Sequence, residues 1–271
     1  MTHRLFEEKH HASIYQKYRI SPPDKLKELI LEYLDNKKGP PYELAVDLGC
    51  GTGQNTRLLA CHFKKIVGLD VSENQLEEAR AVPGFENVTY RSGSAEELPF
   101  PDGSVDLLTA ASAAHWFDPE RFLNEATRVL KPCGCIALLG YTDQFSLRYG
   151  SCGDELDKIF AEVKNVARLY ASSNVAVANS KLQDLFEAIP FSDKKRLENI
   201  PLKMEMTVAG VVGFVESFSY YQTYFRKDPQ AATSLLDSAM KRALEKMGVS
   251  SPDTELEFTI DFYCVLACKE Q

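Results

Sequence analysis

The sequence lacks any apolar run near the length of roughly 18 residues that a membrane span requires. The first residues include Thr2, Arg4 and two consecutive glutamates, which is not the pattern of a secretory signal peptide. Internal repeats and low-complexity tracts are also missing. We therefore expect a soluble protein of the cytoplasm, with no membrane partner.

Basic side chains are also fewer than acidic ones. The chain of 271 residues has 31 basic against 39 acidic side chains, a formal net charge of −8. Without a broad basic field to attract a phosphate backbone, nucleic acid is not an expected partner. The short run Lys194-Lys195-Arg196 is typical of a solvated turn.

The seven cysteines lack the spacing of either a disulfide framework or a paired metal site. Cys133 and Cys135 form an isolated pair, and the adjacent histidines His10 and His11 cannot share one helix face. We expect reduced, partly buried thiols and no bound metal.

The most informative stretch runs from Val46 to Thr56, where an apolar strand leads into a glycine loop and then a helix. Gly49, Gly51 and Gly53 give the spacing G-x-G-x-G, whereas the dinucleotide fingerprint is G-x-G-x-x-G. Gln54 occupies the position of the third dinucleotide glycine. Asp47, just before the loop, would oppose a pyrophosphate but suits a ligand with a cationic amino acid portion. A nicotinamide oxidoreductase is therefore the disfavoured alternative.

An acidic residue followed by G-x-G-x-G resembles the first motif of the class I S-adenosylmethionine (SAM)-dependent methyltransferases. The resemblance, which extends to the methyltransferase type 11 domain, implies SAM as the cofactor. It also implies that the loop around Asp47, Gly49, Gly51 and Gly53 binds it.

The remaining motifs of that family follow in order. Asp70 ends the apolar stretch Ile66–Leu69, where the resemblance implies a carboxylate that accepts both ribose hydroxyls, with Val71 beside it. The adenine is expected at Ser94, Ala95 and Glu96, and the site continues to Ala111. Many family members have Asp where this chain has Ser94. The late Leu-Lys-Pro-Gly-Gly turn is present as Leu130-Lys131-Pro132-Cys133-Gly134, with a cysteine in place of one glycine.

Near the N-terminus, Tyr15-Gln16-Lys17-Tyr18-Arg19 precedes Pro22. A Tyr-x-x-Tyr-Arg segment before proline resembles the start of small-molecule methyltransferases of the trans-aconitate methyltransferase type, in which it folds over the cofactor. Tyr18 and Arg19 are then candidates to contact the methionine carboxylate, since arginine offers a bidentate grip. An arm that only packs against the protein is the alternative.

Between Glu43 and Gly140, short apolar strands alternate with amphipathic helices, which is the pattern of a parallel sheet covered on both faces. We predict an α/β fold with a Rossmann-like, seven-stranded, mostly parallel sheet and a helical lid inserted after the fifth strand. Ligands bind beyond the carboxyl ends of such strands. The strands are expected at 46–48, 66–69, 88–91, 105–110, 135–140, 195–206 and 255–268, the last one antiparallel as the resemblance implies.

The chain divides into four expected regions. They are an N-terminal arm and helix over the cofactor (1–40), the SAM-binding core (41–145), a mainly helical lid with the substrate pocket (146–250) and a final core strand (251–271). Helices are expected at 24–34, 56–63, 73–80, 119–130, 154–170, 180–188, 208–225 and 229–247.

His115 is the one histidine predicted at the carboxyl edge of the sheet. With an ordinary pKa near 6.5 it could remove a proton from an acceptor, or it could pack under the adenosine. The expected lid contains a row of aromatic residues, part of which we expect to belong to the hydrophobic core. It also contains three arginines whose positions relative to the site do not follow from the sequence. The aromatic residues are Phe214, Phe218, Tyr220, Tyr221, Tyr224 and Phe225, and the arginines are Arg148, Arg168 and Arg226.

We predict a SAM-dependent methyltransferase that acts on a small organic acceptor at O, N or S by in-line displacement. Two alternatives remain open: a SAM-binding protein without transfer activity, and a methyltransferase of proteins or nucleic acids. The sequence does not indicate the acceptor or the oligomeric state.

Overall fold

The computed structural model describes Ile14 and residues 17–271, and its centre is one seven-stranded sheet in the order β3-β2-β1-β4-β5-β7-β6. Neighbouring strands are parallel from β3 to β5, and β7 runs antiparallel to both β5 and β6. This confirms the predicted Rossmann-like α/β class. The strands are β1 Leu44–Leu48, β2 Lys65–Asp70, β3 Val88–Ser92, β4 Val105–Ala111, β5 Leu130–Arg148, β6 Asp193–Thr207 and β7 Glu255–Cys268.

Helices cover both faces of the sheet because the buried residues of a strand point alternately to either side. On β5, Ala137 and Leu139 join the core under α2 (Asp24–Lys37), while Ile136 and Leu138 join the core under α5 (Pro119–Val129) and α8 (Gln183–Ala188). The chain connects these layers through α3 (Gln54–Leu58), α4 (Glu73–Arg80) and two short 3-10 helices, η1 (Ala60–His62) and η2 (Ala114–Trp116).

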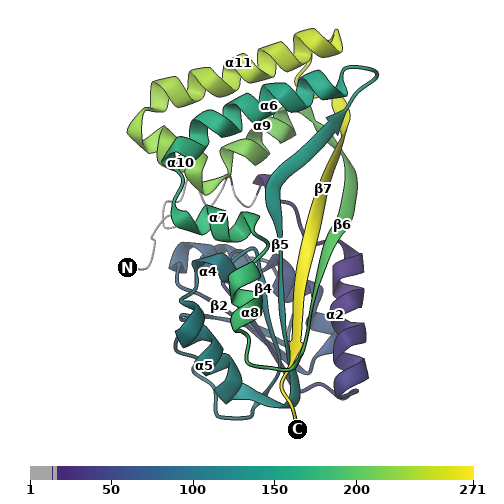
Figure 1. Ribbon diagram of the computed structural model, residues 1–271, viewed down its shortest axis with the longest axis vertical. Helices are drawn as coiled ribbons and strands as arrows, with labels where there is room; N and C mark the ends of the chain where they lie inside the picture. The colour runs from purple at the N-terminus through teal and green to yellow at the C-terminus, as the bar shows by residue number, and fades with distance from the viewer. Residues whose placement is uncertain (1–13, 15–16) are drawn as a thin grey trace.

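Strands β5, β6 and β7 extend well past the rest of the sheet, and the lid helices pack on this extension (Figure 1). The lid core is continuous with the core under α2, so lid and sheet share one apolar interior. The lid consists of α6 Gly153–Ala167, η3 Arg168–Tyr170, α7 Ser173–Asn179, α9 Val208–Glu216, α10 Ser219–Lys227 and α11 Pro229–Met247.

Several elements differ in extent from the sequence-based expectation. The fifth strand is much longer than 135–140, because antiparallel β7 pairs with it as far as Arg148. The helix predicted over 208–225 is two helices, separated where Phe218 adopts extended backbone. The helix predicted over 56–63 is likewise divided, into α3 and η1.

Within the described part of the chain, no helix combines the length and the hydropathy that crossing a bilayer demands. The same residues contain no group of three or more His, Cys, Asp or Glu side chains arranged to hold a metal ion.

Candidate functional site

The glycine loop follows β1 at the carboxyl edge of the sheet, and its three glycines all have positive φ, at 60°, 52° and 78°. Glycine adopts such angles without the steric cost of a Cβ. A Cβ on Gly49 would lie 2.5 Å from the Cβ of Ala113, and one on Gly53 would collide with the Tyr90 hydroxyl. At Gly51 the nearest atom would be Oε1 of Gln75, 3.7 Å away. Gly49 and Gly53 therefore permit internal packing, whereas Gly51 leaves room beside the loop.

Asp47 is completely buried at the base of this loop. Its carboxylate accepts hydrogen bonds from Nδ2 of Asn55 at 2.8 Å and Oγ1 of Thr56 at 2.6 Å. Burial raises the pKa of Asp47 to about 6, and these two bonds oppose the shift. The visible contribution of Asp47 is to hold the start of α3 against β1, and a direct cofactor contact stays a prediction.

Asp70 lies at the end of β2, next to the glycine loop. Its two oxygens accept from the backbone N–H of Gly51 and of Ser72, both at 2.8 Å, while burial raises its pKa. Each carboxylate oxygen can accept a further hydrogen bond. The next residue, Val71, leaves 54% of its surface exposed, an apolar surface beside the carboxylate.

The loop between β3 and β4 contains the expected adenine segment, Ser94 to Glu96. Hydrogen bonds connect this loop to α5 and its N-cap at two points. Ala95 is buried, and Oε1 of Glu96 accepts from the backbone N–H of Asp118, the N-cap of α5, at 2.9 Å. Ser94 forms a backbone bridge to Glu97. Glu96 is thus engaged in fixing its own loop.

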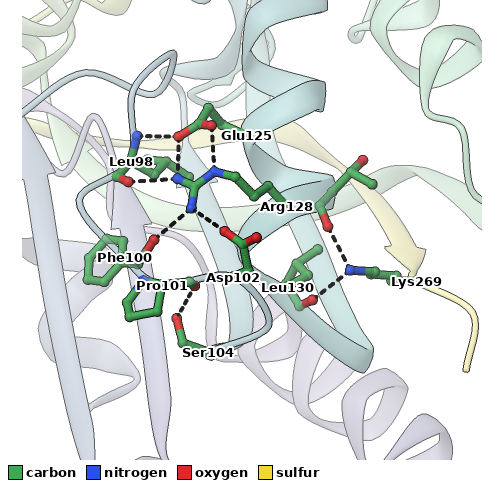
Figure 2. Close-up of polar contacts among 10 residues, drawn as sticks. Leu98, Phe100, Pro101, Asp102, Ser104, Glu125, Arg128, Leu130 and Lys269 are labelled. Atoms are coloured by element: carbon green, nitrogen blue, oxygen red, sulfur yellow. Dashed lines mark hydrogen bonds and ion pairs between the residues drawn. The ribbon is translucent and has the colours of Figure 1, made fainter.

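The second connection is made by the side chain of Arg128, near the end of α5 (Figure 2). Its guanidinium donates to the carbonyl groups of Leu98 at 2.9 Å and Phe100 at 2.8 Å, and to the carboxylates of Asp102 and Glu125. Glu125 in turn accepts from the Leu98 backbone N–H at 2.7 Å. Because the segment from β3 to β4 contains no helix, these side chains satisfy its backbone polar groups.

The described end of the N-terminal arm lies between the sheet and the lid. The Tyr18 ring packs on α9, where a Cβ added to Gly213 would lie 2.6 Å from it. Arg19 donates to the Tyr141 hydroxyl at 2.7 Å and to the Ser217 carbonyl at 3.3 Å. Its guanidinium carbon is also 5.3 Å from the centre of the Phe218 ring. The rest of the predicted arm, residues 1–13, 15 and 16, lies outside the described residues.

Two neighbouring cavities share Arg19, Ser112 and Tyr141 among their lining residues. One of about 540 Å³, which we call the loop cavity, is lined by the glycine loop together with Asp47, Asn55 and Ala111. The other, of about 580 Å³, is the lid cavity, whose wall includes His115, Trp116, Asp143, Asn179, Tyr220 and Tyr263. The structure thus brings Arg19, Asp47, Gly49, Gly51 and Ala111 around one cavity and His115 around its neighbour. Tyr18, Gly53, Asp70, Val71 and the segment 94–96 do not line either.

His115 lies on η2, with its ring 5.1 Å from the Trp116 ring. Burial lowers the pKa of His115 to about 3, and the positive charge of Arg19 adds to the shift. The imidazole is therefore neutral throughout the physiological pH range.

Of the lid residues named from the sequence, Tyr220 and Phe218 reach the lid cavity. Tyr221 instead donates to the Ala232 carbonyl at 2.8 Å, and Tyr224 stacks on Tyr170. Arg148 pairs with Asp157, and Arg168 forms two hydrogen bonds to the carboxylate of Asp143.

The residues of the lid cavity that sequence reasoning missed include Tyr141, Asp143, Asn179 and Tyr263. Tyr141 and Asp143 belong to the extension of β5 that the prediction cut off at Gly140. The one available signal was the polar pair Thr142-Asp143 directly after an apolar strand, a common place for a residue that faces a site.

Comparison with known proteins identifies residues 46–138 as a methyltransferase domain. A methyltransferase of Dictyostelium discoideum is 27% identical over 257 residues, which cover 94% of this chain and 92% of the relative. An uncharacterized methyltransferase-like protein of Schizosaccharomyces pombe is 30% identical over 199 residues, 73% of each chain. The fold is similar to that of a type II methyltransferase from Anaeromyxobacter dehalogenans, with a TM-score of 0.71 at 24% identity, over 94% of this chain and 100% of that one.

Proposed function

The chain belongs to the class I SAM-dependent methyltransferases, and from this premise we propose that it methylates a small organic acceptor held in the lid cavity. The observation that carries the proposal is the junction of the two cavities at Arg19, Ser112 and Tyr141. A donor in the loop cavity and an acceptor in the lid cavity would meet there.

The residues that line the loop cavity, together with those next to the glycine loop, fit SAM, the cofactor of this family. Gly51 leaves space that a Cβ would enter, and Oε1 of the buried Gln75 next to it accepts no hydrogen bond from any described residue. Asp70 can accept from ribose hydroxyls with its remaining lone pairs, and exposed Val71 offers an apolar surface for the adenine. When bound, SAM supplies a methyl group on a positively charged sulfur.

Transfer of this methyl group requires the acceptor atom to lie in line with the sulfur, on the opposite side of the methyl carbon. We propose that the chain contributes mainly by positioning, which can account for most of the acceleration of such a step. The lid helices and the arm around Arg19 would exclude water from the junction. In this proposal the core 41–145 holds the cofactor, and the region 146–250 closes an acceptor cavity whose wall also includes core residues such as His115 and Asp143.

For His115 we propose contact with the acceptor through a neutral imidazole. A base with a pKa near 3 is far too weak to remove a proton efficiently at neutral pH, since efficient general bases have pKa values near the working pH. His115 would instead orient the acceptor through a hydrogen bond, which suits an acceptor that is already deprotonated or needs no proton removal.

The test is transfer of radiolabelled methyl from SAM in a cell extract to which the purified protein is added. We expect label in the small-molecule fraction, and none with the Gly51→Val variant. Label in protein or nucleic acid would establish the macromolecular alternative. Calorimetric binding of SAM with no label in any fraction would establish a binding protein, and binding of NADH in place of SAM would refute the cofactor assignment.

A further inference from the structure

Asp143 lies in the wall of the lid cavity with only 6% of its surface exposed, where the register between β5 and β7 shifts. Its carboxylate accepts from Nε of Arg168 at 2.8 Å and from Nη2 at 2.7 Å. This bidentate pair balances the charge and fixes the plane of the carboxylate. Asp143 is therefore a rigid point between the sheet and the lid.

Tyr220 receives its orientation from this carboxylate. The phenol donates to Oδ2 of Asp143 at 3.1 Å. Burial, with the charge of Asp143 second, raises the pKa of Tyr220, so the hydroxyl stays protonated. A hydroxyl has one proton and two lone pairs. With the proton directed at Asp143, Tyr220 offers the cavity an oxygen that can only accept.

Asn179 offers a hydrogen-bond donor to the cavity, whereas Tyr220 offers an acceptor. Its Oδ1 accepts from the Asp143 backbone N–H at 3.2 Å, which assigns the oxygen and nitrogen of the amide. Its Nδ2 has no acceptor among the described residues, and both Asn179 and Tyr220 line the lid cavity. Asp143 thus orients both the acceptor oxygen of Tyr220 and the donor nitrogen of Asn179 in the wall of the lid cavity.

We propose that Tyr220 and Asn179, held by Asp143, recognise an uncharged group on the methyl acceptor that both donates and accepts a hydrogen bond, namely an amide or a hydroxyl. This rests on the proposed function, in which the lid cavity holds the acceptor. A carboxylate has no proton for the Tyr220 oxygen, and an ammonium group has no lone pair for Asn179. A bound carboxylate would leave the Tyr220 oxygen without a donor, and a bound ammonium group would leave Nδ2 of Asn179 without an acceptor. Each unpaired group weakens the binding of the charged ligand.

Three probes of similar shape test this: phenylacetamide, phenylacetate and 2-phenylethylamine, which are neutral, anionic and cationic at pH 7. Each is titrated into protein saturated with S-adenosylhomocysteine and followed by ligand-observed NMR. We expect phenylacetamide to bind about tenfold more tightly than either charged probe, the ratio that one lost hydrogen bond implies. Equal or stronger binding of a charged probe, or binding of none at millimolar concentration, overturns the proposal.

Two variants show whether the wall sets the preference. Tyr220→Phe removes the hydrogen-bond acceptor that a carboxylate cannot use, so it should remove most of the preference for phenylacetamide over phenylacetate. Asn179→Asp replaces a donor by an acceptor without changing shape, so the cation should gain affinity while the amide loses it, which loss of structure alone would not produce. The control is Tyr224→Phe on the same helix, which stacks on Tyr170 outside the cavity and should keep the native preference.

S-adenosylhomocysteine affinity, measured in the same samples, separates this proposal from the proposed function. Normal affinity with no probe preference refutes only the recognition by Tyr220 and Asn179. Failure of the native protein to bind S-adenosylhomocysteine refutes the function itself.

Discussion

The carboxylate of Asp70 accepts a hydrogen bond from the backbone N–H of Gly51 across 2.8 Å, so the end of β2 holds the glycine loop that follows β1. The other oxygen of Asp70 accepts from Ser72, the N-cap of α4. One partly buried side chain therefore orders two loops at the carboxyl edge of the sheet, and a change at Asp70 should affect both.

Replacing Asp70 by alanine should weaken SAM binding at least about tenfold, because the ribose hydroxyls lose their acceptor and the loop loses its tether. Isothermal titration calorimetry measures the effect. Asp237→Ala, at an exposed position on α11, is the control and should bind SAM normally. Native affinity in the Asp70 variant would refute the ribose assignment.

Gly51→Val should abolish SAM binding. The valine side chain would enter the space beside the loop, at a backbone φ of 52° that β-branched residues rarely adopt. Gly150→Val is the matched control, since Gly150 has φ of 50° and no atom within 4 Å of an added Cβ, in the turn after β5. Both variants should lose about 1–2 kcal/mol of stability from backbone strain.

Only the Gly51 variant should also lose the cofactor. Equal SAM affinity in the two glycine variants would mean that Gly51 does not face the ligand, and the loop cavity would then not be its binding site.

The neutral state of His115 predicts a sign for the pH dependence of stability. Between about pH 6.5 and 3 the unfolded imidazole binds a proton that the folded one does not, so stability falls as the pH is lowered through this range, by at most about 1.4 kcal/mol per pH unit. Asp47 acts in the opposite direction, because its pKa of about 6 makes the folded carboxyl take up a proton first.

Comparison with His115→Gln isolates the histidine contribution. Urea unfolding at pH 6.5 and pH 5 should show a smaller loss of stability in the variant than in the native protein. An equal loss in both proteins would show that the imidazole is not held neutral. At pH 7 the variant should lose turnover with little change in SAM affinity, whereas equal loss of both would favour a packing role.

Arg128→Ala should loosen the segment between β3 and β4 that is expected to hold the adenine. Loss of its bonds to two backbone carbonyls and two carboxylates should cost about 1–3 kcal/mol of stability and lower SAM affinity several-fold. Arg121→Ala, at an exposed position on the same helix, is the control. Hydrogen exchange should rise at Leu98 and Phe100, and native exchange rates there would contradict the argument.

The sheet and the glycine loop at its carboxyl edge were predictable from the sequence because their signals are local. The glycine spacing and Asp70 at a strand end each lie within a few residues of the element that they define. The order of the motifs then identified the sheet and its carboxyl edge. Tertiary structure was needed to show that the carboxylates of Asp47 and Glu96 accept hydrogen bonds from neighbouring residues of the protein.

The lid cavity, which we propose holds the acceptor, was not predictable, because its residues are distant in sequence. Asp143 meets Arg168, Asn179 and Tyr220 through an extension of β5 that exists only because β7 pairs with it. No local pattern indicates that pairing. The break between α9 and α10 at Phe218 was not predictable either. The apolar periodicity continues across Phe218, although the chain changes direction there and Tyr220 reaches the lid cavity.

A crystal structure with S-adenosylhomocysteine tests the central claim most directly. The account predicts the methionine portion in the loop cavity beside Gly51, the ribose at Asp70, the adenine between Val71 and Ala95, and the sulfur at the junction of Arg19, Ser112 and Tyr141 with the lid cavity beyond it. A sulfur that faces away from the lid cavity, or a ligand bound elsewhere, would contradict it.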